Sequence, residues 1–474
     1  MEKWNNGSKS KFITSRENRE GKEAKMPIKK SRYLIIHQAQ VVRFSLSYIS
    51  SLCILHFAFC TFVSVAFAQP GDFLSQFHPS ITVQEEYTDN LNLANTNRQD
   101  EWITTISPGL KWSTLPGKGE TPSKYGVDLD YRLGLVFYAN NSQDNYVSHS
   151  GSLNTWLSLS PRLTIRLRDY LVRSQEPRER EYAAGASTEQ FLLATQRERF
   201  IYLRNVVEPS VTYQFGKEDS FELNYRNMIY QNQNPLSEDS QENSINPRLT
   251  YWFNIRNGIV LEYGFTHGDF EISPDFISHM ARGRYTYRFN PRTSAFVEYT
   301  FTRHDFEFQG RDYDVHSAGL GIEHGFTPTL SGRIQVGYFW QNAESGSSSN
   351  GVSYSLGLTQ SGEKTTYSIS FQGGYTEDYF SAENLGFTKT HTAIASINHR
   401  LHQRITLGIF GSAGRAEYAS DRIDWIYRIG GNVSLQVFRW LTLSLEASHS
   451  SCDSNIDNLD YRENRGIFRI NAAI

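Results

Sequence analysis

Hydrophobic and polar residues alternate along most of the chain after residue 80, and this alternation predicts β-strands. From Tyr125 to Phe137 every odd position is Tyr, Val, Leu or Phe, while Asp128, Asp130 and Arg132 occupy even positions. Residues 259–266, 367–376 and 422–437 repeat the pattern. Successive side chains of a strand point to opposite faces, so each segment predicts one apolar and one polar face. The segments run to about 10–15 residues, whereas strands of soluble proteins usually have about 5–6.

Two kinds of connection alternate between these segments. Short turns rich in Pro, Gly and Asn fall at residues 160–162, 216–219, 256–258, 290–292, 327–329, 361–363 and 438–440. Long polar loops fall at residues 89–100, 139–146, 174–199, 231–243, 268–276, 305–314, 342–350, 377–386, 417–422 and 450–464. This asymmetry is typical of an up-and-down transmembrane barrel with its long loops outside the cell. We therefore expect an all-β, antiparallel barrel of about 20 strands, or 18 if the first pair is irregular, with both chain ends on the short-turn side.

Composition supports a membrane barrel over a soluble β protein. Aromatic residues make up 14% of the chain, and no segment after residue 69 is apolar for long enough to form a spanning helix. Lipid-facing strand residues and aromatic girdles explain this combination. A soluble β-propeller is the alternative, but it predicts a repeat of about 40–50 residues, and the sequence has none.

The first 68 residues read as a targeting segment. A basic stretch precedes an apolar run from about Phe44 to Val65, which ends in the small-x-small site Ala66-Phe67-Ala68. Cleavage between Ala68 and Gln69 is expected, and Met26 is an alternative start that leaves a signal of ordinary length. The predicted organisation is a removed signal with an N-terminal extension (1–68), a short periplasmic lead-in (69–79) and an outer-membrane barrel (80–474). A membrane-anchoring helix is the alternative for the apolar run.

Removing this segment changes both charge and cysteine content. It holds 11 of the 47 Lys and Arg residues and 4 of the 50 Asp and Glu residues, so the remainder carries a net charge of −10. An acidic chain argues against nucleic acid as a partner. Only Cys452 remains after cleavage, so the mature chain forms no internal disulfide.

Strand parity assigns a set of charged residues to the interior. The basic ones are Arg132, Arg166, Arg168, Arg226, Arg248, Arg284, Arg288, Arg333, Arg428 and Arg469, and the acidic ones are Asp128, Asp130, Glu208, Glu222, Glu262, Glu298 and Glu446. Arginines in a pore offer planar, multi-donor contacts to anionic glycans. The alternative is a ladder of Arg–Glu pairs that neutralises a polar interior. The longest and most charged loop, residues 174–199, has two interpretations as well: an inward constriction or an exposed loop.

Little in the sequence points to catalysis or to metal binding. Asp453, Asn455 and Asp457 stand at alternate positions, as ligands of a calcium loop do. The tight-turn glycine and the final glutamate of such a loop are missing, so a solvated acidic loop is the favoured interpretation. No nucleophile lies in a recognisable local motif with a histidine, so we expect no enzyme activity and no cofactor.

The segment from His78 to Leu110 carries a family resemblance. It contains Tyr87-Thr88-Asp89-Asn90 at the end of one predicted strand and Ser107-Pro108-Gly109 in the next. These features resemble the putative β-barrel porin 2 family of outer-membrane proteins. The resemblance implies an association with exopolysaccharide or capsule export, and it brings no catalytic residues with it.

Three functions remain open at this stage. The first is a porin-like channel that exports or anchors an exopolysaccharide in the outer membrane of a Gram-negative bacterium. The second is a general diffusion porin for small solutes, and the third is a structural or adhesive protein that acts through its long loops. Expected partners are outer-membrane lipid and lipopolysaccharide, the barrel-assembly machinery, which reads an alternating last strand such as Gly466–Ile474, and, for the first function, a polysaccharide chain with periplasmic export proteins.

Overall fold

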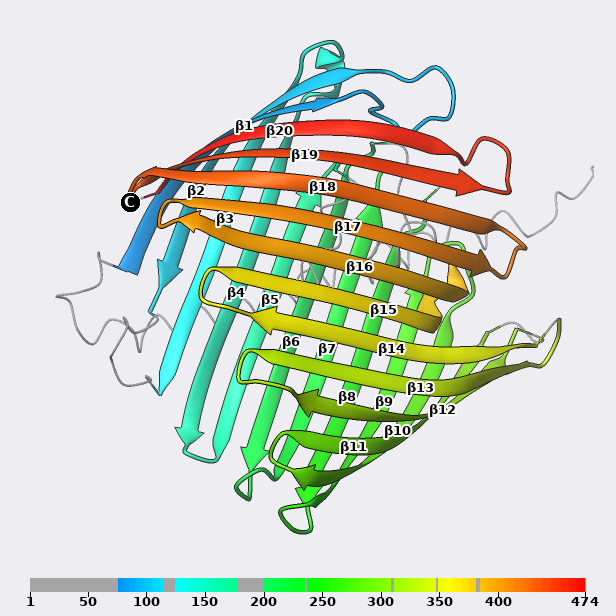
Figure 1. Ribbon diagram of the computed structural model, residues 1–474. Helices are drawn as coiled ribbons and strands as arrows, with labels where there is room; N and C mark the ends of the chain where they lie inside the picture. Colours follow the sequence, from blue (N-terminus) through cyan, green and yellow to red (C-terminus); the bar gives the residue numbers. More distant parts are fainter. Residues whose placement is uncertain are drawn as a thin grey trace, which may run out of the picture. The chain divides into compact units, whose positions relative to one another are not determined.

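The computed structural model describes residues 76–114, 124–176, 199–234, 237–307, 311–346, 348–380 and 384–473. Within them the alternating segments form twenty strands in one sheet (Figure 1). The first ten are β1 (Phe77–Thr88), β2 (Glu101–Ser113), β3 (Tyr125–Tyr138), β4 (Tyr146–Ser160), β5 (Leu163–Ser174), β6 (Tyr202–Gln214), β7 (Ser220–Asn232), β8 (Ser240–Trp252), β9 (Asn257–Phe270) and β10 (Phe276–Asn290). The others are β11 (Thr293–Phe306), β12 (Tyr313–Gly325), β13 (Leu330–Ala343), β14 (Ser349–Ser361), β15 (Thr365–Asp378), β16 (Gly386–His402), β17 (Ile405–Tyr418), β18 (Ile423–Phe438), β19 (Leu441–Ser454) and β20 (Tyr461–Ala473).

Each strand pairs antiparallel with its neighbours in sequence, and the sheet closes on itself. β1 pairs with β20 from Ser80 opposite Ala473 to Thr88 opposite Arg465. Because the sheet is closed, no strand has an edge with unpaired backbone N–H and C=O groups. A β-structure in lipid must be closed in this way, since lipid offers these groups no hydrogen-bond partners. The expected up-and-down barrel of twenty strands is confirmed. No helix among the described residues is long and apolar enough to cross a membrane.

The two ends of the barrel differ as expected. β1 begins and β20 finishes at the end with the short turns, here called the short-turn end, and the opposite end is called the long-loop end. The connection of residues 114–124 between β2 and β3 is an exception, because it is long although it lies at the short-turn end. β1 begins at Phe77, three residues before the expected boundary, because the Phe77 ring stacks on Trp112 of β2 with ring centroids 5.8 Å apart. The predicted signal, its cleavage site, residues 69–75 and Ile474 lie outside the described residues.

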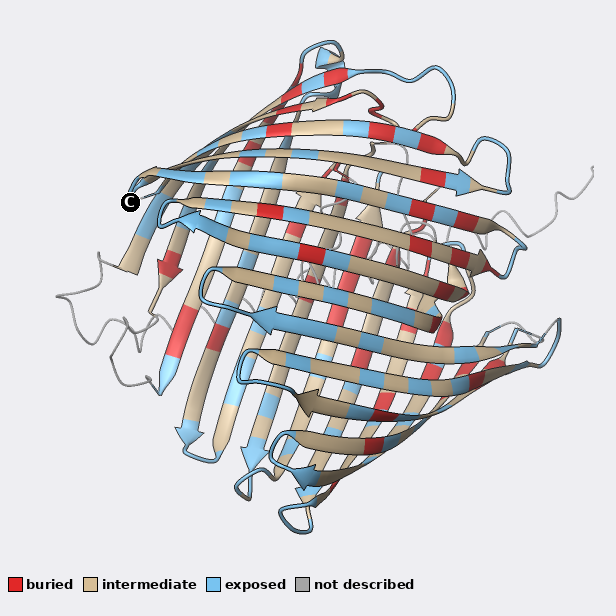
Figure 2. Ribbon diagram, viewed as in Figure 1, coloured by how far each residue is buried: buried red, intermediate tan, exposed pale blue. Residues whose placement is uncertain are grey.

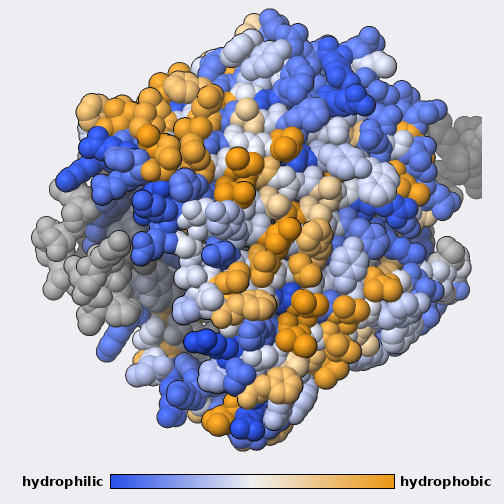
Figure 3. Space-filling model, viewed as in Figure 1, coloured by the Kyte–Doolittle hydropathy of each residue, from blue (hydrophilic) through white to orange (hydrophobic). Residues whose placement is uncertain are grey.

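Alternation divides the side chains of every strand between two faces. Large apolar residues are exposed on the outer face, for example Leu261 and Tyr263 of β9, Ile334 and Val336 of β13, and Phe468 of β20. Figure 3 shows hydrophobic side chains across the middle of the visible outer face and hydrophilic ones gathered towards its upper right. Apolar groups exposed in this way are stable only in contact with lipid.

Buried residues gather at the long-loop end instead of along the whole barrel (Figure 2). One cluster joins Val172, Tyr202 and Tyr230 of β5–β7, and another joins Tyr313, Val315, Phe339 and Phe387 of β12, β13 and β16. These side chains point inward and are covered by loops that fold into the barrel. The only packed core of the described barrel therefore lies inside its long-loop end.

Candidate channel mouth and its latches

The charged residues that parity assigned to the interior lie on the inner face. β3 carries Asp128, Asp130 and Arg132, β5 carries Arg166 and Arg168, and β6–β8 carry Glu208, Glu222, Arg226 and Arg248. β9–β11 carry Glu262, Arg284, Arg288 and Glu298, and Arg333, Arg428, Glu446 and Arg469 lie on β13, β18, β19 and β20. All of them share the face opposite to the exposed apolar side chains.

Most of these charges have an opposite charge beside them. Arg226 contacts Glu208 at 2.7 Å and Glu242 at 3.1 Å. Further pairs are Arg132–Asp130 at 3.1 Å, Lys111–Asp128 at 3.4 Å, Arg168–Glu208 at 3.8 Å, Arg282–Glu298 at 2.6 Å, Arg282–Glu262 at 3.5 Å, Arg284–Glu323 at 2.8 Å, Arg288–Glu218 at 2.7 Å, Arg333–Glu323 at 3.7 Å and Arg469–Glu446 at 3.1 Å. Many of these side chains are partly exposed, so each pair adds little stability. The contacts are those of a neutralising ladder.

Four of the predicted residues are not among these pairs. Arg166, Arg248 and Glu222 form no ion pair with any described residue, although Arg248 stands directly opposite Glu222 and Glu262 in register. The guanidinium of Arg428 lies 5.1 Å from the ring centre of Phe410. The described wall therefore has no large unbalanced group of arginines that would form an anion site.

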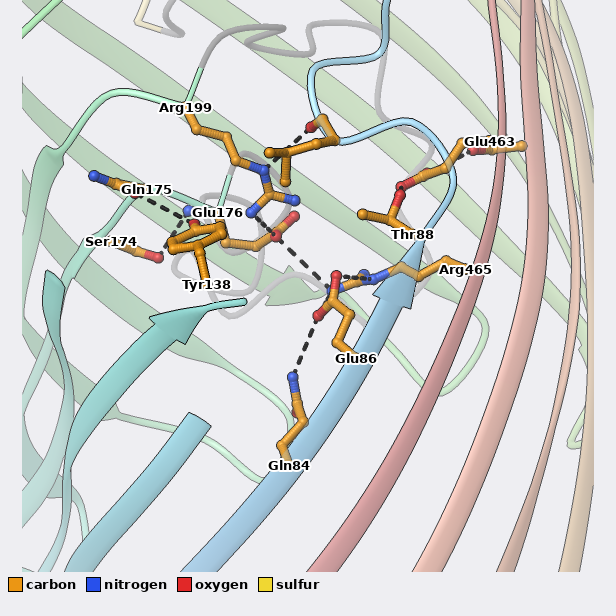
Figure 4. A network of polar contacts seen from close by, with 12 residues as sticks. Gln84, Glu86, Thr88, Tyr138, Ser174, Gln175, Glu176, Arg199, Glu463 and Arg465 are labelled. Carbon is orange, nitrogen blue, oxygen red and sulfur yellow. Dashed lines mark hydrogen bonds and ion pairs between the residues drawn. The ribbon is translucent and has the colours of Figure 1, made fainter. Parts of the chain in front are cut away.

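The densest charge network lies higher, where the β5–β6 loop folds inward (Figure 4). Glu176 and Arg199, the described ends of this loop, contact each other at 2.9 Å. Arg465 of β20 binds both carboxylate oxygens of Glu86 on β1 at 2.7 Å and lies 3.8 Å from Glu176. We call Glu86, Glu176, Arg199 and Arg465 the first latch, because they tie the β5–β6 loop to the seam between the first and last strands.

Burial makes the first latch strong. The side chains of all four residues are at most 12% exposed. Burial by itself would lower the pKa of the Arg199 guanidinium, yet the carboxylate of Glu176 outweighs it, aided by Tyr138 and Glu86, and the pKa is raised above its ordinary value. Removing one partner from such a network leaves an uncompensated charge in a dry site.

Tyrosines of the inner wall donate hydrogen bonds to the described start of this loop. Tyr202 donates its hydroxyl hydrogen to the backbone oxygen of Glu176 at 2.9 Å, and Tyr138 donates to the Gln175 side chain at 3.3 Å. Tyr202 also stacks on Tyr230 with ring centroids 6.0 Å apart. Residues 177–198 lie outside the described residues, but both described ends of the loop are anchored inside the barrel. The two interpretations of residues 174–199 thus concern mainly residues outside the described part of the chain.

The Tyr-Thr-Asp-Asn segment that carries the family resemblance closes the barrel seam beside the first latch. The Thr88 hydroxyl donates to Glu463 at 2.9 Å, and Asp89 accepts hydrogen bonds from the backbone and side-chain nitrogens of Asn464 at 2.7 and 2.6 Å. Asn90 donates to the backbone oxygen of Arg462 at 2.9 Å. These contacts join the two ends of the sheet, so the motif has a structural role at closure.

A polar recess of about 230 Å³ opens in the wall below the first latch. Thr82 and Gln84 of β1, Thr105 of β2, and Arg132 and Gly134 of β3 are among its lining residues. Gly109 of the Ser-Pro-Gly segment makes room for Arg132, because a Cβ built there would lie 2.8 Å from Ser80 Oγ and 3.1 Å from Arg132 Cγ.

Replacing Gly109 with alanine is therefore expected to displace Arg132 and to lower the free energy of unfolding by about 1–3 kcal/mol, the usual cost of overpacking. Urea titration of the refolded barrel measures this loss. Gly357→Ala is the matched control, because a Cβ at Gly357 meets nothing within 4 Å. Equal losses in the two variants would contradict the steric explanation.

A second inward loop lies between β15 and β16. Phe380 stacks on Phe270 of β9 with ring centroids 5.4 Å apart, and Tyr379 packs on Phe276 of β10 at 4.9 Å. The Asn384 side chain donates to Glu238 at 2.8 Å and to Ser273 at 3.1 Å. Glu238 and Ser273 belong to the β7–β8 and β9–β10 loops, so the β15–β16 loop reaches past β11–β14 to the β9–β10 hairpin and past β9–β14 to the β7–β8 hairpin. We call Tyr379, Phe380 and Asn384 with these partners the second latch.

A buried histidine supports the second latch from the wall. His304 of β11 has an Nε2 atom 2.9 Å from Glu377 Oε1 and a ring 5.5 Å from that of Tyr379. Tyr313 donates its hydroxyl hydrogen to the same Glu377 oxygen at 2.7 Å and also contacts the Tyr379 hydroxyl. Burial raises the pKa of Tyr379 above its ordinary value, and Glu377 adds to this shift. The tyrosine therefore stays neutral and keeps its hydroxyl hydrogen as a donor.

The β1–β2 loop completes the inward layer. Leu93 packs with Ile426, Cys452 and Tyr461 of β18–β20, and the backbone oxygen of Leu91 accepts a hydrogen bond from Arg199 at 3.2 Å. The three loops thus cover inner-wall residues from different parts of the barrel circumference. The described residues of all three loops make contacts on the inner side of the long-loop end.

The candidate calcium loop is engaged in loop packing. Asn455 accepts a hydrogen bond from the Ile423 backbone nitrogen at 2.7 Å and donates to the backbone oxygen of Asp421 at 2.9 Å. Asp453 is the penultimate residue of β19, and Asp457 lies in the loop that follows it. Among the residues that the structure describes, no three His, Cys, Asp or Glu side chains come together as a metal site would require.

Comparison with known proteins agrees with this geometry. Residues 274–473 match the sequence profile of a family described as putative beta-barrel porin 2. The matched region runs from β10 to β20, which is less than half of the chain. The match confirms the family inferred from the sequence, although it covers the second half of the barrel and not the N-terminal segment on which the resemblance was noticed. The protein is thus a porin-like channel of the Gram-negative outer membrane.

Other comparisons add little. No curated protein sequence matches the chain. The solved structures similar to it include OccK3 (OpdO) of Pseudomonas aeruginosa, with 14% identity, a TM-score of 0.43 and coverage of 85% of this chain and 97% of that one. The outer membrane protein OpdK of the same organism has 12% identity, a TM-score of 0.43 and coverage of 85% and 100%. Likeness at this distance does not bear on solute or selectivity.

Several residues of the porin mouth escaped prediction from the sequence. Glu86 and Arg465 stand at inward positions of the alternating pattern, so strand parity could have assigned both to the barrel interior. Glu238, Phe380 and Asn384 lie in loops, where no periodicity exists. Their partners are far away in sequence, so only the closed barrel brings them together.

Proposed function

We propose that this porin-like barrel passes small hydrophilic solutes and that its long-loop mouth is narrowed by loops fixed to the inner wall. The first latch is the observation that carries this proposal. The described ends of the β5–β6 loop are held inside the barrel by a nearly fully buried network of four charges, and an unobstructed barrel of twenty strands would leave a wide aqueous channel. The neutralising ladder on the wall supports passage of polar solutes without strong selection by charge.

Export or anchoring of an exopolysaccharide, which the family resemblance implied, is the competing hypothesis. A polymer chain needs a continuous wide lumen, so the two latches would have to release before it could pass. The observed loop anchoring favours the small-solute channel for this reason.

Planar bilayer recording separates the two hypotheses. The proposal expects small, steady single-channel currents from the wild-type barrel, and liposome swelling with mono-, di- and trisaccharides is expected to fall steeply with sugar size. A barrel that is silent until its loops are released would overturn the small-solute proposal and favour the polymer conduit.

Weakening the second latch is expected to widen the mouth. Phe380→Ala removes the ring that stacks on Phe270 and Phe276, a change that costs about 3–5 kcal/mol in a full core and less for this half-buried ring. The variant should admit larger sugars in the swelling assay and show higher conductance. Phe289→Ala, at an exposed position of the outer face near the short-turn end, is the matched control and should leave both properties unchanged.

A further inference from the structure

Ten polar pairs lie on the outer face close to the extracellular rim, nine of them within one long-loop hairpin each and one between β14 and β16. Three pairs join a tyrosine hydroxyl to a histidine Nδ1 atom at 2.7 Å: Tyr131–His149, Tyr263–His279 and Tyr299–His316. Others are Glu85–Thr104 at 2.7 Å, Asp169–Asn205 at 2.7 Å, Tyr225–Asn243 at 2.8 Å, Tyr338–Asn350 at 2.8 Å, Tyr354–His391 at 3.1 Å and His449–Asn464 at 2.9 Å. On β17 and β18, Arg415 lies over the Trp425 ring at 5.6 Å. We call this set the outer belt.

The members of the outer belt stand at one height. In seven of the ten strands that descend from the long loops, the belt residue is the fourth of its strand: Thr104, His149, Asn205, Asn243, His279, His316 and Asn464. A common distance from the strand start, repeated around a closed sheet, makes a ring. Chance placement of polar residues on a lipid-facing surface does not produce this regularity.

One member of the outer belt depends on a glycine. Tyr354 of β14 reaches His391 of β16 across the intervening strand β15, where Gly373 leaves space. A Cβ at Gly373 would lie 2.4 Å from the Tyr354 ring and 2.6 Å from His391. The pair thus forms even where its two residues are not on adjacent strands.

The outer belt lies near the upper edge of the apolar surface, with a few apolar residues such as Ile277 above it. Over β9–β20 many outward residues above the belt are charged, including Asp269, Arg303, Lys389 and Asp453. Over β1–β4 aromatic residues stand above it, and Tyr87 packs on Trp102 with ring centroids 5.0 Å apart. Interfacial aromatic and charged residues are expected where hydrocarbon gives way to head groups.

A lower polar row marks the other boundary. His324 contacts Thr293 at 2.9 Å and His399 contacts Thr365 at 2.7 Å, both on the outer face near the short turns. His316 and His324 are eight residues apart, as are His391 and His399. Eight strand residues at about 3.3 Å each, tilted by about 40°, cover a height of about 20 Å. This height is close to that of the apolar band of an outer-membrane barrel, so the outer belt lies at the level of the outer head groups.

The chemistry of the outer belt suits a polar, phosphorylated layer. In His149 and His279 a hydrogen bond between a tyrosine hydroxyl and Nδ1 fixes the orientation of the imidazole ring. The Nε2 atoms of these two histidines have no partner among the described residues. Neutral imidazole that accepts at Nδ1 carries its hydrogen on Nε2, which makes that atom a donor. Lys389 adds a cation just above the ring, and Arg303 lies at the same level in ion pairs with Asp305 and Glu344. Outward donors and cations at this height match phosphate oxygens of lipid head groups.

We propose that the outer belt is a docking surface for the phosphorylated sugar head groups of lipopolysaccharide. The ten polar pairs are spread around the closed sheet, so the barrel contacts the glycolipid layer around its circumference and not at a single site. The lower row of histidines faces the opposite leaflet and serves as an internal comparison. This assignment does not depend on which solute crosses the channel.

The experiment compares two sets of histidine variants in the full barrel. The belt variant combines His149→Phe, His279→Phe and His391→Phe, and the matched control combines His324→Phe and His399→Phe. Each refolded protein is titrated with purified lipopolysaccharide, with the same glycolipid after enzymatic removal of its phosphates, and with phosphatidylethanolamine vesicles. The readouts are bound glycolipid per barrel and the shift of the unfolding midpoint.

Wild type and the lower-row control are expected to bind lipopolysaccharide equally and to unfold at a higher temperature in its presence. The belt variant should bind at least fivefold more weakly and lose most of that shift, while its response to phosphatidylethanolamine stays unchanged. Equal binding by belt variant and wild type overturns the proposal, as does an equal loss in the control. Full binding of the dephosphorylated glycolipid overturns the assignment to phosphates. If the belt variant does not fold, Tyr131→Phe combined with Tyr263→Phe, which removes only two hydroxyls, must show the same selective loss.

Discussion

Replacing Arg199 with methionine is expected to raise the single-channel conductance several-fold and to admit larger sugars. The change leaves the carboxylate of Glu176 beside that of Glu86 with only Arg465 to compensate both. An uncompensated buried charge costs about 3–5 kcal/mol. A bias of that size favours a rearranged loop by more than a hundredfold, so Glu176 is expected to move to water and to take the loop end with it. Planar bilayer recording and liposome swelling measure the result.

The matched control is Arg166→Met. Arg166 is also an arginine of the inner wall, but it is exposed and forms no ion pair with any described residue. The Arg166→Met substitution removes one positive charge from the lumen, as Arg199→Met does, but it changes no residue of either latch. Its conductance should stay near that of the wild type, with at most a change in ion preference. If Arg199→Met and Arg166→Met give equal conductance, the first latch does not hold the mouth narrow.

Replacing Arg465 with methionine is expected to lower the free energy of unfolding by about 3–5 kcal/mol, the usual cost of breaking a buried pair. Arg465 binds both oxygens of Glu86 at the seam where β20 closes on β1, and the Glu86 side chain is only 4% exposed. Its removal weakens the closing pair of strands as well as the β5–β6 loop. Denaturant titration of the refolded barrel provides the measurement.

A double substitution checks whether the loss of stability comes from the carboxylate of Glu86 that Arg465→Met leaves without its partner. Replacing both partners, with Glu86→Leu and Arg465→Met, removes the charge together with its partner, and such exchanges are often close to neutral. We expect the double variant to recover most of the stability lost in the single one. A double variant as unstable as Arg465→Met alone would show that packing and not charge explains the loss.

Much of the barrel could be predicted from local pattern. The period of two fixes which residues share a face, and a register error would move Leu261 or Arg226 to the wrong side of the sheet. Strand number, the positions of most turns and the inner placement of the predicted arginines all follow from this rule. The alternation needs no knowledge of distant contacts, because it arises from the geometry of a single strand.

The pattern has limits even within strands. β15 exposes Tyr367, Ile369 and Phe371 on its outer face, yet Tyr375 is stacked on Phe387 and packs against Phe339 of the inner cluster. Gly374 lies between these two parts of the strand with a φ of 147°, a conformation that suits glycine. Parity alone assigned Tyr375 to the same face as Phe371. The tertiary structure sets its position.

The sequence by itself predicted an outer-membrane barrel of about 20 strands with a polar interior and long loops at one end, because hydrophobic periodicity is a local property. Only the tertiary structure decided which interior charges pair and where the loops go. Arg465 meets Glu86 because the last strand closes on the first, and Phe380 meets Phe270 of β9 because one loop folds inward past five strands. Such contacts depend on closure and loop path, which leave no periodic trace in the chain.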